Sequence, residues 1–249
     1  MKNKRWGFFN DTKLAEPLPA KPEQLATESL VKRWRFSPTD LTQSRRQTLL
    51  RLARTAIVSH LQTGSIPDYE TNEPVLRRRA GAFVTLWKRV EPLEPGLPGG
   101  ALYSLESESE DVTSVSSETS LRGCIGHVQA DTPLCQIVQE MAVAAATADP
   151  RMPPMAMDEL DAVKIEISVL SPLQLITDIH QIQIGTHGLM IVDGLRRGLL
   201  LPEVPQRLHW DREAFLANLY RKAGLSADCW PGSATLYMFT TVKFGEASG

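Results

Sequence analysis

The chain has 249 residues, of which 42% are hydrophobic and 22% are charged, and its formal net charge is -2. This composition lies in the globular range and excludes an intrinsically disordered chain. Because 27 basic residues nearly balance 29 acidic ones, the charge gives no support to nucleic-acid binding, and no nucleic-acid partner is predicted.

Targeting and metal-binding signals are also missing from the sequence. Residues 1–13 begin with basic charge but lack the apolar run of a signal peptide. The most apolar helical stretch, residues 137–148, is shorter than the roughly 20 residues that cross a bilayer. The three cysteines have no metal-type spacing, and three is an odd number for a disulfide framework. We therefore predict a cytoplasmic protein with reduced thiols, no membrane contact, no metal and no cofactor.

The first predicted elements follow an N-terminal extension. Residues 1–39 hold four prolines and no sustained hydrophobic period, which is typical of a partly flexible extension. The main domain is expected over residues 40–245. Apolar residues at three- and four-residue steps predict a helix from Thr42 to Leu61, ended by Gly64. Residues 82–87 are rich in strand-forming types and predict a strand inside a sheet.

Residues 91–120 differ in composition from the rest of the domain. They hold seven acidic residues and no basic one, together with three prolines and three glycines. Such a segment buries too little apolar surface to offset its ordering entropy, which predicts a flexible acidic insertion. It is either an acidic interaction loop or a solvated hairpin tip.

The middle of the chain predicts two strands around a helix. Residues 121–128 are short, apolar and glycine-containing, as in a strand. Thr132 and Pro133 supply an N-cap and a first helical position, which predicts a helix through Ala148 that stops before Pro150. Residues 164–170 alternate between apolar and polar types, as in a half-buried strand.

The last part predicts a hairpin, a helix and a strand. Residues 189–192 and 197–201 flank an Asp193-Gly194 pair, a strong hairpin signal. Asp211 is placed to cap a helix that ends before Gly224. Residues 236–244 predict a final strand. Helices interspersed with hairpins favour an α+β fold with a mixed or antiparallel sheet and packed helices.

The best site candidate surrounds Cys124. In a regular strand Arg122, Cys124 and Gly126 share one face, so a guanidinium would lie beside the thiol and lower its pKa. Gly123 and Gly126 remove side chains next to the thiol, which lets a ligand or another backbone approach closely. The alternative is that Cys124 is a small buried residue and Arg122 a surface one. His127 would lie on the opposite face.

Two further groups are candidates for the same site. His187 stands between two glycines at a strand entry, where a histidine acts as a base, a ligand donor or a proton shuttle, or is purely structural. Asp149 and Arg151 are held by prolines, and they form either a ligand-clamping pair or an ion pair that satisfies itself.

Together these motifs resemble the AMMECR domain family, known in prokaryotes as AmmeMemoRadiSam system protein A. The resemblance covers about residues 44–244 and implies an α+β fold with a cleft between a larger and a smaller part. It also implies an association with a radical SAM protein and with a Memo-like protein, and it supplies no reaction. The segments that carry it, in chain order, are Phe83-Val84-Thr85-Leu86, Leu121-Arg122-Gly123-Cys124-Ile125-Gly126, Asp149-Pro150-Arg151-Met152-Pro153-Pro154, Ile167-Ser168-Val169-Leu170-Ser171-Pro172, Ile184-Gly185-Thr186-His187-Gly188-Leu189, Gly198-Leu199-Leu200-Leu201-Pro202, and Arg221-Lys222-Ala223-Gly224-Leu225 followed by Trp230.

Two functions follow as hypotheses. The favoured one is an accessory component that binds a small molecule or a peptide for these two partners. The other is an enzyme in which Cys124 is the thiolate nucleophile and Arg122 and His187 assist it. We favour the first because the sequence supplies no complete set of nucleophile, base and orienting group.

Overall fold

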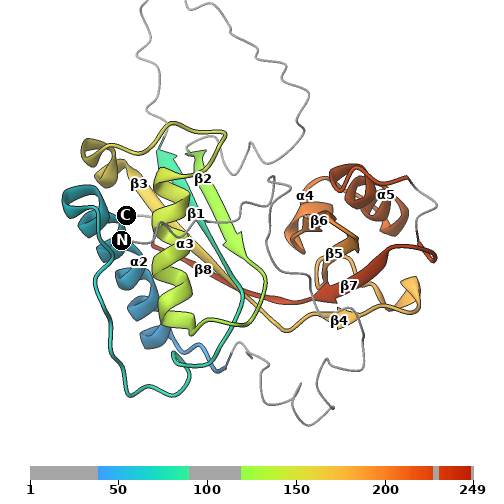
Figure 1. Cartoon of the computed structure of the whole chain (residues 1–249), viewed down its shortest axis with the longest axis horizontal. Coiled ribbons are helices and arrows are strands. Elements are labelled where there is room, and N and C mark those ends of the chain that lie inside the picture. Colours follow the sequence, from blue (N-terminus) through green and yellow to red (C-terminus); the bar gives the residue numbers. More distant parts are fainter. Residues whose placement is uncertain (1–38, 90–118, 227–229, 248–249) are drawn as a thin grey trace, which may run out of the picture.

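The computed structural model describes residues 39–89, 119–226 and 230–247. The N-terminal extension, nearly all of the acidic insertion and Cys229 lie outside the described residues. The described chain forms two lobes, each built on a four-stranded sheet (Figure 1). The strand order is β2-β1-β3-β8 in the larger lobe and β4-β7-β5-β6 in the smaller one. All described strand pairs are antiparallel, which confirms the α+β prediction.

The larger lobe packs two helices on one face of its sheet. Apolar side chains of both helices and of the facing strand positions form the main core. Helix α2 ends as predicted, with Gly64 in the left-handed conformation at φ 74°. No helix among the described residues combines the length and the hydropathy that a membrane span requires. The elements of this lobe are α2 (Gln43–Thr63), β1 (Ala82–Arg89), β2 (Thr119–His127), α3 (Leu134–Thr147), β3 (Val163–Leu170) and β8 (Thr241–Gly245).

Helix α3 begins later than predicted and without a side-chain cap. Pro133 is extended at ψ 140°, and the Thr132 hydroxyl donates to Asp131 rather than to the helix. The first amides of the helix donate instead to backbone carbonyls of the segment before β1, Leu134 to Arg78 and Cys135 to Leu76. Since these carbonyls satisfy the orphan amides, the predicted Thr132 cap is wrong.

The smaller lobe confirms the predicted hairpin and capped helix. The hairpin turn is Gly194-Leu195, one residue later than the predicted pair, because Asp193 pairs with Arg196. The Asp211 carboxylate accepts a hydrogen bond from the Ala214 amide at 2.8 Å. The elements of this lobe are β4 (Gln174–Leu175), β5 (Gly188–Asp193), β6 (Arg196–Leu200), α4 (Glu203–Arg207), α5 (Arg212–Lys222) and β7 (Thr235–Phe239).

The final strand was predicted as one element, and this is wrong. The chain changes sheets at Thr240, so β7 belongs to the smaller lobe and β8 to the larger. The other crossing between the lobes comes earlier in the chain, at Ser171, between β3 and β4. The two crossings are hydrogen-bonded: the Ser171 amide donates to the Thr240 carbonyl, and the Thr240 amide donates to Ser171 Oγ, both at 2.9 Å. Figure 1 shows the two connections running side by side.

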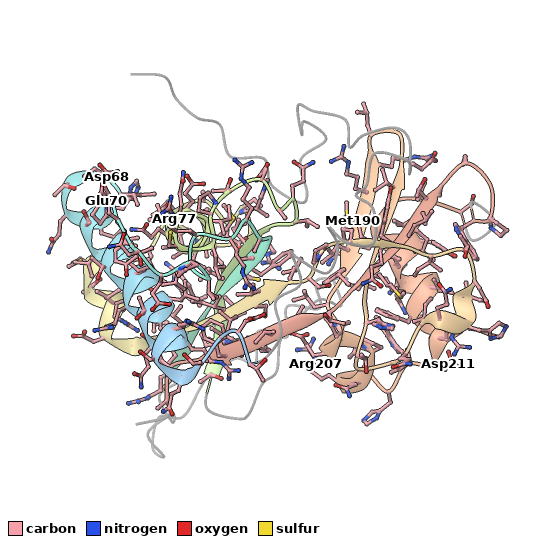
Figure 2. All side chains as sticks on the ribbon, turned by 90° about the horizontal axis from the view of Figure 1, so that it is seen from below. Asp68, Glu70, Arg77, Met190, Arg207 and Asp211 are labelled. Carbon is pink, nitrogen blue, oxygen red and sulfur yellow. The ribbon has the colours of Figure 1, made fainter. Side chains whose placement is uncertain are left out.

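An apolar cluster, here called the junction cluster, fills part of the space between the lobes. Figure 2 shows one of its members, Met190, where the lobes meet. Two members come from the larger lobe and four from the smaller one, so burial of this cluster holds the lobes together. The members are Phe83, Leu170, Met190, Leu199, Tyr237 and Phe239.

Candidate functional site

Cys124 lies on the face of the larger sheet that points away from α2 and α3. Its neighbours in β2, Gly123 and Ile125, face the helices: a Cβ on Gly123 would meet the α3 backbone, and Ile125 belongs to the main core. Strand alternation therefore directs Cys124 to the other face. There it is partly exposed and packs against the junction cluster.

A row of polar side chains crosses this face from strand to strand. In register, Cys124 pairs with Thr85 and Thr85 with Glu166. Thr85 Oγ1 donates to Cys124 Sγ at 3.2 Å, and Lys243 Nζ donates to Glu166 Oε1 at 2.9 Å. We call these four residues the polar row. Lys243 Nζ also lies 3.2 Å from Glu203 Oε1 of α4, so the row is tied to the smaller lobe.

The environment of Cys124 favours the neutral thiol. Burial raises the pKa of the Cys124 thiol above its ordinary value. The Thr85 hydrogen bond and the charge of Arg151 oppose this, while the charges of Asp149 and Glu166 add to it. At neutral pH the group is therefore a weakly polar thiol rather than a thiolate.

Arg122 does not lie beside the thiol, contrary to the alternation expected from the sequence. Leu121 pairs with Trp87 and Gly123 pairs with Leu86, so Arg122 is the extra residue of a β-bulge. A bulge breaks the two-residue alternation and re-aims the side chain of the extra residue. The prediction that the Arg122 guanidinium neighbours Cys124 is therefore wrong.

The Arg122 side chain makes a buried ion pair instead. Its Nε and Nη2 each donate to a carboxylate oxygen of Glu159 at 2.8 Å, and only 8% of the side chain is exposed. Lys88 Nζ donates to the same carboxylate at 3.0 Å. The Arg122 hydrogen bonds hold the pKa of the Glu159 carboxyl well below its usual range. This arrangement fastens β2 to the 3-10 helix Met157–Ala162.

Asp149 and Arg151 do meet Cys124, through its backbone. β2 is an edge strand, and at its outer edge the Cys124 amide donates to Asp149 Oδ2 at 2.8 Å. Arg151 Nε and Nη2 donate to the two oxygens of the same carboxylate at 3.0 and 2.8 Å, and Arg151 Nη2 lies 3.4 Å from the Cys124 carbonyl oxygen. The pair thus takes the place of a neighbouring strand at this residue. Burial alone would raise the pKa of the Asp149 carboxyl, but these hydrogen bonds outweigh it and lower the pKa.

The protein itself fills the space beside both glycines. A Cβ on Gly123 would lie 2.1 Å from the Ala145 carbonyl oxygen of α3, so backbone approach explains this glycine. A Cβ on Gly126 would lie 2.1 Å from the Phe83 ring. Of the two alternatives left open for Gly123, the approach of another backbone is the one observed.

His187 lies in the smaller lobe, in the turn before β5. Its Nδ1 accepts a hydrogen bond from the Gln183 amide at 3.2 Å. Burial lowers the pKa of the imidazole, which favours the neutral ring. Among the described residues, the groups that act on the Cys124 thiol are Thr85 and the charged residues named above, and His187 is not one of them. Cys135, in α3, is buried in the main core.

Three members of the polar row were not among the predicted site residues. Thr85, Glu166 and Lys243 lie on three different strands, so only the register of the sheet brings them together. A signal was present in the alternation of residues 164–170, whose polar positions define the face on which Glu166 lies. Within the described ranges, no group of three His, Cys, Asp or Glu side chains is placed to hold a metal ion.

Comparisons with known proteins found a matching family model, similar sequences and a similar solved structure. The family model described as AMMECR1 matches residues 50–244. Protein PH0010 of Pyrococcus horikoshii is 37% identical over 205 residues, which cover 80% of this chain and 88% of that protein. Protein MJ0810 of Methanocaldococcus jannaschii is 43% identical over 136 residues, covering 52% of this chain and 68% of that protein. The crystal structure of the uncharacterized protein PH0010 matches with a TM-score of 0.67 at 34% identity, covering 83% of this chain and 94% of that chain.

Proposed function

Because this chain belongs to the AMMECR1 family, we propose that it is a cytoplasmic accessory component that binds a small molecule or a peptide. The binding face is the polar row, where it borders the junction cluster. The partners are a radical SAM protein and a Memo-like protein, the two that the family resemblance implies.

The observation that carries this proposal is the state of the Cys124 thiol. Its sulfur accepts a hydrogen bond from Thr85, and burial raises its pKa. A nucleophilic cysteine needs the opposite, namely a lowered pKa or a base within hydrogen-bond reach. A neutral thiol next to a hydroxyl and beside an apolar cluster is suited to contacting a bound molecule.

The alternative is an enzyme in which Cys124 attacks as a thiolate with the help of Arg122 and His187. It would require these two side chains to reach the thiol. Arg122 is bound to Glu159, and the His187 ring accepts a hydrogen bond from the Gln183 amide. The described contacts therefore favour the binding function over this one.

The test is reconstitution with the two partners of the same host. The full chain is immobilised, and capture of the purified radical SAM protein and Memo-like protein is measured separately and together. The Cys124→Ser variant exchanges the sulfur for a hydroxyl oxygen, a small change of the side chain that removes the nucleophilic thiol. We expect capture of at least one partner, equal within about twofold for the wild type and the variant, which is less than 0.5 kcal/mol of binding energy.

Two results would overturn the proposal. If neither partner is captured while both are folded and soluble, the accessory function fails. If capture is normal but covalent modification of Cys124 accompanies the reaction of the assembled system, the enzyme alternative replaces it.

A further inference from the structure

We infer that the smaller lobe is a hinged cover for the polar row, held closed by the ion pair between Glu203 and Lys243. This inference concerns the regulation of the binding face and so rests on the proposed function. Its elements are a pivot, a latch and a site that the cover partly buries.

The pivot is the pair of chain crossings. Residues 172–239 of the smaller lobe are inserted between β3 and β8, so the chain joins the lobes at two points. These points, Ser171 and Thr240, are fastened to each other by two hydrogen bonds of 2.9 Å. Two adjacent linkers that bond to each other form one axis, which is the geometry of a hinge between packed bodies.

The latch is the contact of α4 with the polar row. Glu203 is the first residue of this helix, and its carboxylate lies 3.2 Å from Lys243 Nζ. Lys243 is held in turn by Glu166 of the larger sheet at 2.9 Å. One ammonium group thus joins a carboxylate from each lobe.

The site that the cover reaches is Cys124. This residue packs against the junction cluster, four of whose six members belong to the smaller lobe. Rotation about the crossings would withdraw those four side chains from the sheet and expose the thiol and Thr85 beside it. Because the cluster is apolar, the closed arrangement predominates, and the latch adjusts how often it opens.

The solvent exposure of the Lys243–Glu203 ion pair determines how strongly it changes the fraction of open molecules. The Lys243 and Glu203 side chains are 36% and 34% exposed. An ion pair at this exposure changes an equilibrium by a factor of about two to five, and salt screens it. Loss of the latch should therefore increase the fraction of open molecules by about two- to fivefold.

The experiment measures iodoacetamide labelling of Cys124 in the full chain, read by peptide mass spectrometry. Glu203→Gln removes the latch charge, and Glu213→Gln, at an exposed position of α5, is the matched control. A complete pH profile separates the plateau rate, which reports access, from the midpoint, which reports the pKa of the thiol.

We expect the plateau rate to rise about two- to fivefold in Glu203→Gln and to stay at the wild-type value in Glu213→Gln. Raising the salt concentration from 0.05 to about 1 M should increase the wild-type rate and leave the Glu203→Gln rate unchanged, because the latch is already lost. An unchanged plateau in Glu203→Gln, or an equal salt response in both proteins, would overturn the hinged cover. Such a result leaves partner capture by the wild-type chain unaffected, so the two proposals fail separately.

Discussion

Replacing Asp149 with alanine removes the side chain that closes the outer edge of β2. The carboxylate is 1% exposed and accepts hydrogen bonds from the Cys124 amide and from the amide, Nε and Nη2 of Arg151. Breaking a buried ion pair from one side costs about 3–5 kcal/mol. Because the Arg151 side chain is 41% exposed and can regain water, we expect a loss near the lower limit, about 3 kcal/mol.

The assay is urea unfolding followed by circular dichroism, with Asp131→Ala as the control. Asp131 also accepts side-chain hydrogen bonds, from His127 Nε2 and Thr132 Oγ1, but it is 51% exposed. Its replacement should change the free energy of unfolding by less than about 0.5 kcal/mol. If the two variants lose equal stability, the Asp149 carboxylate does not hold the strand edge.

The difference in unfolding free energy between the wild type and Asp149→Ala should depend on pH in a defined direction. The pKa of Asp149 is lowered in the folded state, whereas the unfolded value is about 3.9. The folded protein therefore binds this proton less tightly, and the carboxylate contributes its full stability above the unfolded pKa. The gap between wild type and Asp149→Ala should be constant from about pH 5.5 to 8 and should shrink as the pH falls below about 4 toward the folded pKa. A gap that widens in acid would contradict the assignment.

Three further predictions concern the surroundings of Cys124. Gly123→Ala places a Cβ 2.1 Å from the Ala145 carbonyl oxygen. It should lower the free energy of unfolding by about 3 kcal/mol or more, measured by thermal unfolding. An unchanged melting temperature would refute the close contact between β2 and α3. Arg122→Met should lower the free energy of unfolding by about 2–3 kcal/mol, because Glu159 loses both Arg122 hydrogen bonds and keeps Lys88 as its cation. It should leave the midpoint of Cys124 labelling in place, and a shifted midpoint would mean that the guanidinium acts on the thiol after all. Thr85→Val removes a hydrogen bond that lowers the thiol pKa, so the labelling midpoint should move to higher pH, and movement to lower pH would count against this contact.

The sequence was informative wherever one element carries its own pattern. The apolar spacing of residues 49–61 and the following Gly64 predict α2 with its end, and Asp211 predicts the start of α5. These signals are local, because a helix face and a cap are set by residues within a few positions of each other. The hairpin at Gly194 follows for the same reason.

The features that shape the site are not local. The bulge at Arg122 depends on how β2 pairs with β1, and nothing in the order of residues 121–126 fixes that register. The change of sheets at Thr240 occurs without glycine or proline, inside a run of strand-forming residues. For the polar row, the positions of Thr85 and Lys243 relative to Cys124 follow only from pairings across four strands.

The proposed function requires Cys124 to be a neutral contact residue of a binding face and not a nucleophile. The most direct test is the pH dependence of iodoacetamide labelling in the folded wild-type chain, with Cys124, Cys135 and Cys229 separated as peptides. We predict slow labelling of Cys124 with an apparent pKa above the ordinary thiol value of about 8.5. Fast labelling with an apparent pKa near 7 or below would identify a reactive thiolate at this position and overturn the proposed function.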